Sequence, residues 1–203
     1  GAAIGGLLFP SKGPSTEGPR LGDLSVSSSA YGMPIPIIYG TMRVAGNMIW
    51  SSGLREVRKK QKVGGKSGGG GTQTTYSYYA SFAVAFGEGP AEDVLRIWAD
   101  SKLIHDKTST AAHTSKAGVK FRFHPGNETQ LPDPLIAAHV GAGRAPAHRG
   151  LVVIVFEDLP LADFGNRIPN INAEISYNRV VQKPVLAADW IQPAEGGLLQ
   201  TAT

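Results

Sequence analysis

A glycine-rich tract in the first half of the chain constrains its fold more than any other feature. Gly64 to Gly71 (GGKSGGGG) separates the basic run Leu54 to Val63 (LREVRKKQKV) from Thr72 to Phe86 (TQTTYSYYASFAVAF). Glycine favours neither helix nor strand, because its backbone is the freest of all residues. Thr, Tyr, Phe and Val are typical strand residues, so two extended runs around a flexible tip predict a long β-hairpin.

The two halves of this hairpin differ in polarity. Residues 54–79 are mostly polar or basic and are predicted to project from the body as an arm. Ala80 to Phe86 is apolar and is predicted to enter the core. Side chains alternate along a strand, so Phe82, Val84 and Phe86 should share the buried face.

The rest of the chain predicts a mainly β fold with one or two short helices. Hydrophobic residues make up 41%, enough for a packed core, and 26 Gly and 14 Pro favour turns over helices. The best helix is Pro132 to Val140, where Asp133 can cap the first turn and Pro134 suits it. The expected strands are Ile37–Tyr39 ending at Gly40, Met42–Trp50 with a bend at Gly46-Asn47, a hairpin of 94–98 and 102–106, a central strand Leu151–Phe156, and Ile171–Tyr177 against that strand.

The ends of the chain differ from this body in composition. Residues 1–22 are expected to be a linker or the end of a preceding segment, 23–178 a β-rich domain, and 179–203 an exit segment to a neighbouring domain. The apolar opening Gly1 to Phe9 has no basic region before it, unlike a signal peptide. It is also far shorter than the roughly 20 residues of a membrane span. We therefore expect no membrane span and a sequence taken from a longer chain.

Tests for catalytic and metal chemistry find no matching pattern. The chain has no Cys, which excludes disulfides and a cysteine nucleophile. Gly65-Lys66-Ser67 resembles the end of a phosphate loop, but Lys60 stands where that motif needs its first glycine, and a strand-like segment follows. The five histidines lack zinc-site spacing, no Gly-x-Ser-x-Gly occurs, and no carboxylate pair stands out. We predict no enzyme, no cofactor and no metal; a cell-wall hydrolase stays open as an alternative.

The basic arm is the strongest charge feature in a chain of net charge +4. In a strand, Arg58, Lys60 and Lys62 would share one face, about 7 Å apart. One hypothesis is phosphate contact with nucleic acid, with tyrosines stacking on bases. The alternative, which we favour, is a solvated arm or an arm that docks on an acidic protein surface. The candidate contact residues are Arg55, Arg58, Lys59, Lys60, Lys62, Lys66, Tyr76, Tyr78 and Tyr79.

Two further segments are interpreted as structural corners. Arg149-Gly150 leads into the central strand, and Phe164-Gly165-Asn166-Arg167 follows it through a one-turn helix. Asn and Arg side chains there offer hydrogen bonds that can fix an irregular corner. We therefore assign Arg149, Gly150, Phe164, Gly165, Asn166 and Arg167 a structural role rather than a catalytic one.

Three phrases in order resemble the tail-tip hub proteins of siphophages, which include central tail-fibre-like hubs, and the related hub of gene transfer agents. They are IYGTMRVAGNMIW (38–50), FGEGPAEDVLRIWADSKLIHD (86–106) and a third segment over 121–175 with HPGNETQLPDPLI, AHRGLVVIVFEDLPL and FGNRIPNINAEI. Together the three phrases span about residues 30–178.

The resemblance implies a β-barrel or split-barrel hub domain in the virion tail tip. It implies a homotrimer whose paired barrels mimic the sixfold tail tube. The implied partners are the distal tail protein, the tail tube and tape-measure or other tip proteins, with DNA passing through the tail channel. The sequence is expected to depart from the family in its C-terminal part, where no long fibre region is seen, and in its glycine-tipped arm, which is a variable-looking insertion.

Overall fold

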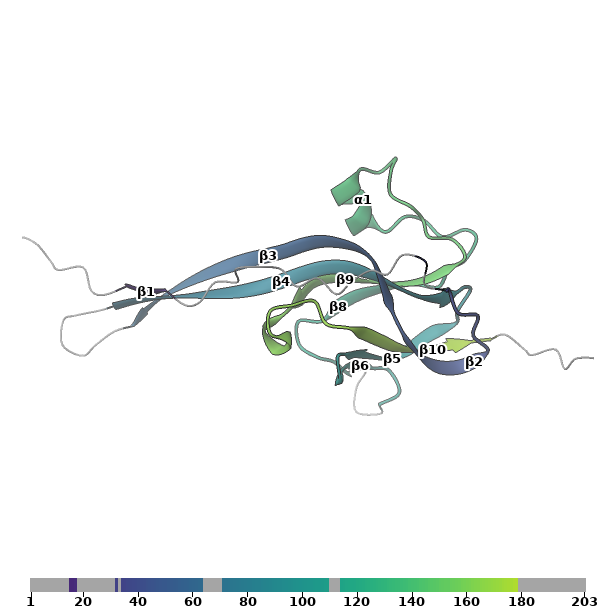
Figure 1. Ribbon diagram of the computed structural model, residues 1–203, viewed down its shortest axis with the longest axis horizontal. Helices are drawn as coiled ribbons and strands as arrows, with labels where there is room; N and C mark the ends of the chain where they lie inside the picture. Colours follow the sequence, from purple (N-terminus) through teal and green to yellow (C-terminus); the bar gives the residue numbers. More distant parts are fainter. Residues whose placement is uncertain (1–14, 18–31, 33, 64–70, 110–113, 179–203) are drawn as a thin grey trace, which may run out of the picture.

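The structure is a computed structural model that describes residues 15–17, 32, 34–63, 71–109 and 114–178. Two mainly antiparallel sheets pack face to face to form the body, and one hairpin extends far beyond them (Figure 1). The predicted mainly β class is confirmed. Lys66 at the predicted arm tip, the exit segment 179–203 and most of the expected linker 1–22 lie outside the described residues.

The first sheet contains the arm. β3 (Asn47–Val63), β4 (Gly71–Glu88), β9 (Leu151–Pro160) and β8 (Lys120–His124) pair antiparallel in that order. β9 reaches only Tyr79 on β4, so the outer parts of β3 and β4 leave the sheet as a two-stranded arm. β1 (Ser15–Glu17), within the stretch expected as linker, pairs parallel with β4 on that arm.

The second sheet has the order β2 (Gly40–Ala45), β10 (Ile171–Tyr177), β5 (Asp93–Ala99), β6 (Lys102–Asp106) and β7 (Thr114–Ser115). All its pairings are antiparallel. The predicted hairpin around Ala99-Asp100-Ser101 is confirmed as β5 and β6.

Two expected strands are corrected by this topology. Residues 34–39 form no strand, and β2 begins at Gly40, where the expected strand was to end. β10 does not pair with the central strand β9 but lies in the opposite sheet. The predicted bend at Gly46 is the point where the chain leaves the second sheet and enters the first, so residues 42–50 belong to two strands.

The core lies between the sheets. Phe82, Val84 and Phe86 of β4 all face it, as their alternation predicted, and Phe82 stacks on Phe156 of β9 with ring centroids 4.9 Å apart. The second sheet contributes its own alternating residues, Ile97 and Ala99 from β5 and Ile171, Ala173, Ile175 and Tyr177 from β10.

A long excursion between β8 and β9 covers the outer face of the first sheet. It carries α1 (Pro134–Val140), which lies above that sheet in Figure 1. Ile136 of α1 packs with Ala83 of β4 and with Val153 and Val155 of β9 in a second apolar cluster. The predicted helix, its Asp133 cap and its early proline are confirmed. A one-turn helix η1 (Ala162–Phe164) follows β9.

Candidate functional site: the arm and the anchored corners

The arm is a regular antiparallel ladder. Residues 55–63 pair with 71–79 without a break, whereas bulges interrupt the pairing of the inner half near Met48–Trp50 and Ser51–Leu54. Directly opposed residues share a face, so Arg58, Lys60 and Lys62 lie with Tyr76, Thr74 and Thr72. The shared face predicted for the three cations is therefore present.

The base of the arm is held against the body by two of the candidate tyrosines. Tyr78 is buried and its hydroxyl donates to Glu56 Oε2 at 3.1 Å. The guanidinium of Arg55 lies 4.8 Å from the centre of the Tyr79 ring, and Arg55 Nε donates to Asp158 Oδ1 at 3.0 Å. These groups make contacts within the chain.

Glu17 of β1 gathers the next pair of candidate residues. Tyr76 donates its hydroxyl to Glu17 Oε1 at 2.6 Å, and Arg58 Nη2 donates to the same oxygen at 3.3 Å. The carboxylate thus fastens β1 to both strands of the arm. Sequence reasoning missed Glu17, because nothing in a Pro- and Gly-rich segment predicts a parallel strand on a distant hairpin.

Three lysines remain on the outer half of the arm. Lys59, Lys60 and Lys62 are exposed, and among the described residues none of them makes an ion pair. The arm therefore presents its unneutralised positive charge beyond Arg58, towards the tip.

Asp100 organises the predicted corner after the central strand. Arg167 Nη2 donates to Asp100 Oδ2 at 2.9 Å and Nη1 donates to Oδ1 at 3.4 Å. The Asn170 amide donates to Asp100 Oδ1 at 3.1 Å, and the Asp100 amide donates to the Asn170 carbonyl at 2.7 Å. Phe164 is buried beneath, and Gly165 and Asn166 adopt the left-handed backbone that such a turn needs. The β5–β6 turn was predicted, but its role as the anchor was not.

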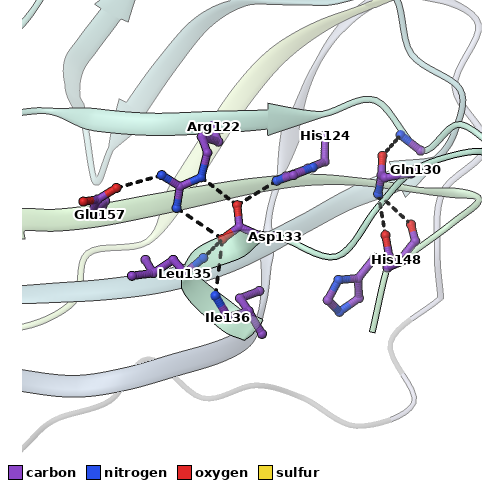
Figure 2. A network of polar contacts seen from close by, with 10 residues as sticks. Arg122, His124, Gln130, Asp133, Leu135, Ile136, His148 and Glu157 are labelled. Atoms are coloured by element: carbon purple, nitrogen blue, oxygen red, sulfur yellow. Dashed lines mark hydrogen bonds and ion pairs between the residues drawn. The ribbon is translucent and has the colours of Figure 1, made fainter. Parts of the chain in front are cut away.

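Gln130 ties the predicted Arg149-Gly150 corner to the loop after β8 (Figure 2). Its side-chain oxygen accepts from the Gly126 amide at 2.7 Å, and its Nε2 donates to the carbonyls of Ala147 and His148 at 2.8 and 3.1 Å. Arg149 Nε donates to the Gln130 carbonyl at 3.2 Å.

A buried carboxylate anchors α1 to the first sheet, as Figure 2 shows. Asp133 Oδ1 accepts from the amides of Leu135 and Ile136 at 2.8 and 3.3 Å. Arg122 of β8 donates to both Asp133 oxygens at 2.7 and 3.2 Å, and His124 Nε2 lies 2.9 Å from Oδ2. Arg122 also donates to Glu157 Oε2 of β9 at 2.7 Å. The sequence indicated the cap but not these partners, which lie 9 to 35 residues apart.

The electrostatics of this network are strongly coupled. Burial alone would raise the pKa of Asp133, but hydrogen bonds from Arg122, His124 and the Leu135 amide lower it to about 2. Contact with Asp133 raises the pKa of Arg122 in turn. Burial lowers the pKa of His148, with a further contribution from nearby His124. The carboxylate is therefore held ionised as a structural anchor.

Among the described residues, no group of three His, Asp or Glu side chains is placed to hold a metal ion. A hollow beside Gly46, lined by Phe82, Val84 and Ile171, has room for little more than a water molecule. In the same part of the chain, no helix is long and apolar enough to cross a membrane.

Comparison with solved structures finds a similar chain in a structure described as the virion of a native gene transfer agent particle. The two chains are 32% identical with a TM-score of 0.55, and the similarity covers 93% of this chain. It covers 37% of the other chain, so this chain spans little more than a third of that length. A scan against protein-family models finds no match. A search of curated proteins finds none either.

Proposed function

We propose that the chain is a structural component of a phage-like particle and that its role is assembly rather than catalysis. The observation that carries this proposal is the 32% identity with a virion chain, maintained over 93% of the sequence. A shared fold alone would say little about function. Identity at this level along nearly the whole domain supports a shared structural role.

More specifically, we propose a hub subunit of the tail tip. In this role copies of the chain form a ring, a homotrimer by family resemblance, that joins the tail tube and distal tail protein to the tip. Tape-measure or other tip proteins would be further neighbours. The features that suit a ring subunit are a rigid two-sheet body and an arm that reaches beyond it.

The way the chain uses its polar groups supports an assembly role. The buried carboxylate Asp133 caps a helix and binds an arginine, and Asp100 ties down a corner. The oxygens of both carboxylates accept hydrogen bonds that hold loops against the sheets. The arm lysines, by contrast, are exposed where a neighbour could reach them.

A second candidate function is contact with nucleic acid through the arm. Lys59, Lys60 and Lys62 favour it, because exposed cations suit phosphate contact. The stacking part of that hypothesis is weaker, since Tyr78 is buried and Tyr79 lies against Arg55. An electrophoretic shift that vanishes steeply with salt would support it, and no shift at low salt would exclude it.

The test of the leading proposal is to locate the chain in particles. Tagged chain should appear at the tail tip in negative-stain images, and particles made without it should lack a complete tip. Finding the tag in the capsid, or finding no tag in purified particles, would contradict the proposal. Cell-wall digestion by the purified chain in a zymogram would contradict its non-enzymatic part.

A further inference from the structure

The body has one exposed apolar segment that its fold does not explain. Ile35, Ile37, Tyr39 and Met42, here called the apolar ridge, have between 56% and 60% of their surface exposed. They fall within eight residues and include four of the seven large exposed apolar residues of the described chain. Large exposed apolar residues gathered in one segment mark an interaction site more often than residues scattered singly do.

The ridge borders the core between the two sheets. Ile38 within it is buried, and Met42 lies opposite Ile175, whose side chain faces the core. β2 pairs with β10 alone among the described strands, so its other edge is open there. The outer face of the first sheet, by comparison, is covered by α1.

The outer face of the second sheet carries paired charges beside Trp98 and the partly exposed Leu103. Arg96 contacts Glu174 at 2.9 Å and Asp106 at 3.5 Å. Arg43, the cation of β2, lies over the Trp98 ring at 4.0 Å. The ridge is thus distinct from both sheet faces.

Two exposed carboxylates flank the ridge. The Glu88 amide donates to the Pro36 carbonyl at 3.0 Å, which places Glu88 beside the ridge. The Glu92 amide donates to Ser176, which lies opposite Thr41 of β2. The ridge segment from Pro34 to Met42 carries no charge itself. The surface is therefore apolar with an acidic border.

The arm is the complementary surface, and it lies at the opposite end of the molecule. Its outer half presents three exposed lysines and Val63, which is 54% exposed. β4 runs from Gly71 near the tip to Glu88 beside the ridge, about 55 Å at ordinary strand rise. The two ends of one strand cannot meet, so any contact between arm and ridge joins two molecules.

We propose that the apolar ridge of one copy receives the outer arm of a second copy. Lys59 and Val63, which share one face of the arm, would lie against the ridge, with Lys59 towards Glu88 and Glu92. The inference rests on the proposed ring assembly and names the docking place of the arm. Such a contact joins different surfaces of identical chains, and it closes into a ring when the rotation between copies permits.

Engineered cysteines test this contact directly, because the chain has no Cys of its own. Gln61→Cys on the arm and Met42→Cys on the ridge are introduced in separate chains, which are mixed or co-assembled into particles and oxidised. A disulfide between the two is expected. Arg144→Cys, on an exposed loop after α1, is the control and should not pair with Gln61→Cys. Equal or preferred pairing with the control would overturn the proposal.

Charge reversal gives an independent test. We expect K59E/K60E/K62E and E88K/E92K each to weaken self-association at least about tenfold in sedimentation, and the mixture of the two variants to restore it. The control R144E should change nothing. Loss without restoration in the mixture would contradict the proposal, as would loss of DNA binding by the arm variant with unchanged self-association.

The two proposals fail differently. If tagged chain sits at the tail tip but arm and ridge never cross-link, only the docking inference is wrong. If purified chain cross-links as expected but never enters particles, the docking contact stands and the virion role is wrong.

Discussion

The inner and outer halves of the hairpin formed by β3 and β4 differ in burial. In the inner half, Phe82, Ala83 and Val84 are buried on both sides of β4, by the second sheet on one face and by α1 on the other. In the outer half β3 presents exposed lysines, Thr74 of β4 is buried, and β1 is the further strand that pairs there. The contrast teaches that the inner half secures the fold, whereas the outer half carries exposed lysines that the fold itself does not require.

The largest loss of stability should come from removing a buried side chain from the inner half of the hairpin. Phe82→Ala removes a fully buried ring stacked on Phe156, and we expect a loss of about 3–5 kcal/mol in the free energy of unfolding. Chemical denaturation measures it. Val63→Ala on the outer half is the matched control, with an expected change below about 0.5 kcal/mol. Equal losses at both sites would contradict the division of the hairpin.

Replacing Asp133, which anchors α1, should cause the second largest loss of stability. Asp133→Asn keeps an oxygen for the helix cap but removes the charge that faces Arg122 in a buried site. We expect a loss of about 2–3 kcal/mol, because half-buried Arg122 then keeps only the exposed Glu157 as an ion-pair partner and the helix cap loses its charge. Amide exchange should accelerate over α1 more than over the arm. Asp163→Asn, at an exposed pair with Lys116, is the control and should cost much less.

Because of the Asp133 carboxylate, we expect the free energy of unfolding to fall at acidic pH. Its folded pKa of about 2 lies below its usual 3.8, so the unfolded chain binds the proton more readily. This contribution, about 2 kcal/mol, is present above pH 4 and is lost as the pH falls towards 2. Denaturation curves between pH 2 and 5 should show the loss in the native chain, and Asp133→Asn should flatten it. An unchanged slope in that variant would assign the acid limb to other groups.

The crossing between the sheets should be sensitive to a single methyl group. A Cβ on Gly46 would lie 2.1 Å from Val84 Cγ1 and 2.8 Å from Phe86 Cε1. We expect Gly46→Ala to lower the free energy of unfolding by about 1–3 kcal/mol, because the core must shift. Gly143→Ala, where nothing lies within 4 Å of the new Cβ, is the control. Equal thermal stability of the two variants would show that Val84 and Phe86 can move to accommodate the added methyl group.

These effects also show which features the sequence could predict. The alternation of Phe82, Val84 and Phe86, the glycine tip, and Asp133 before Pro134 are local patterns, and local backbone preferences decide them. The change of sheet at Gly46 is not local. The sequence predicts a bend within residues 42–50, but it does not show that the bend carries the chain into the other sheet, where Gly46 lies close to Val84 and Phe86.

The candidate site divides in the same way. The cations of the arm are visible as a run of charge, and their shared face follows from strand geometry. Their partners are not visible, because Glu17 and Asp158 come from strands 41 and 103 residues away. Tyr78 reads like its neighbours Tyr76 and Tyr79, yet it lies where the arm enters the core and is buried. Contacts between strands that are distant in sequence decide these roles. The alternation of side chains and the composition do not predict such contacts.

The smallest effect should come from the outer half itself. Glu17→Gln removes an ion pair with Arg58 whose side chains are 46% and 61% exposed, while Tyr76 keeps a hydrogen-bond acceptor. Exposed pairs contribute little, so we expect less than about 0.5 kcal/mol in global stability. The effect should be local, as faster amide exchange at Thr72–Thr74 where β1 pairs with β4. The same change of acid to amide at Asp133 should behave oppositely, with a large global loss. Similar global losses in Glu17→Gln and Asp133→Asn would mean that the arm is part of the cooperative body and is not free to serve a partner.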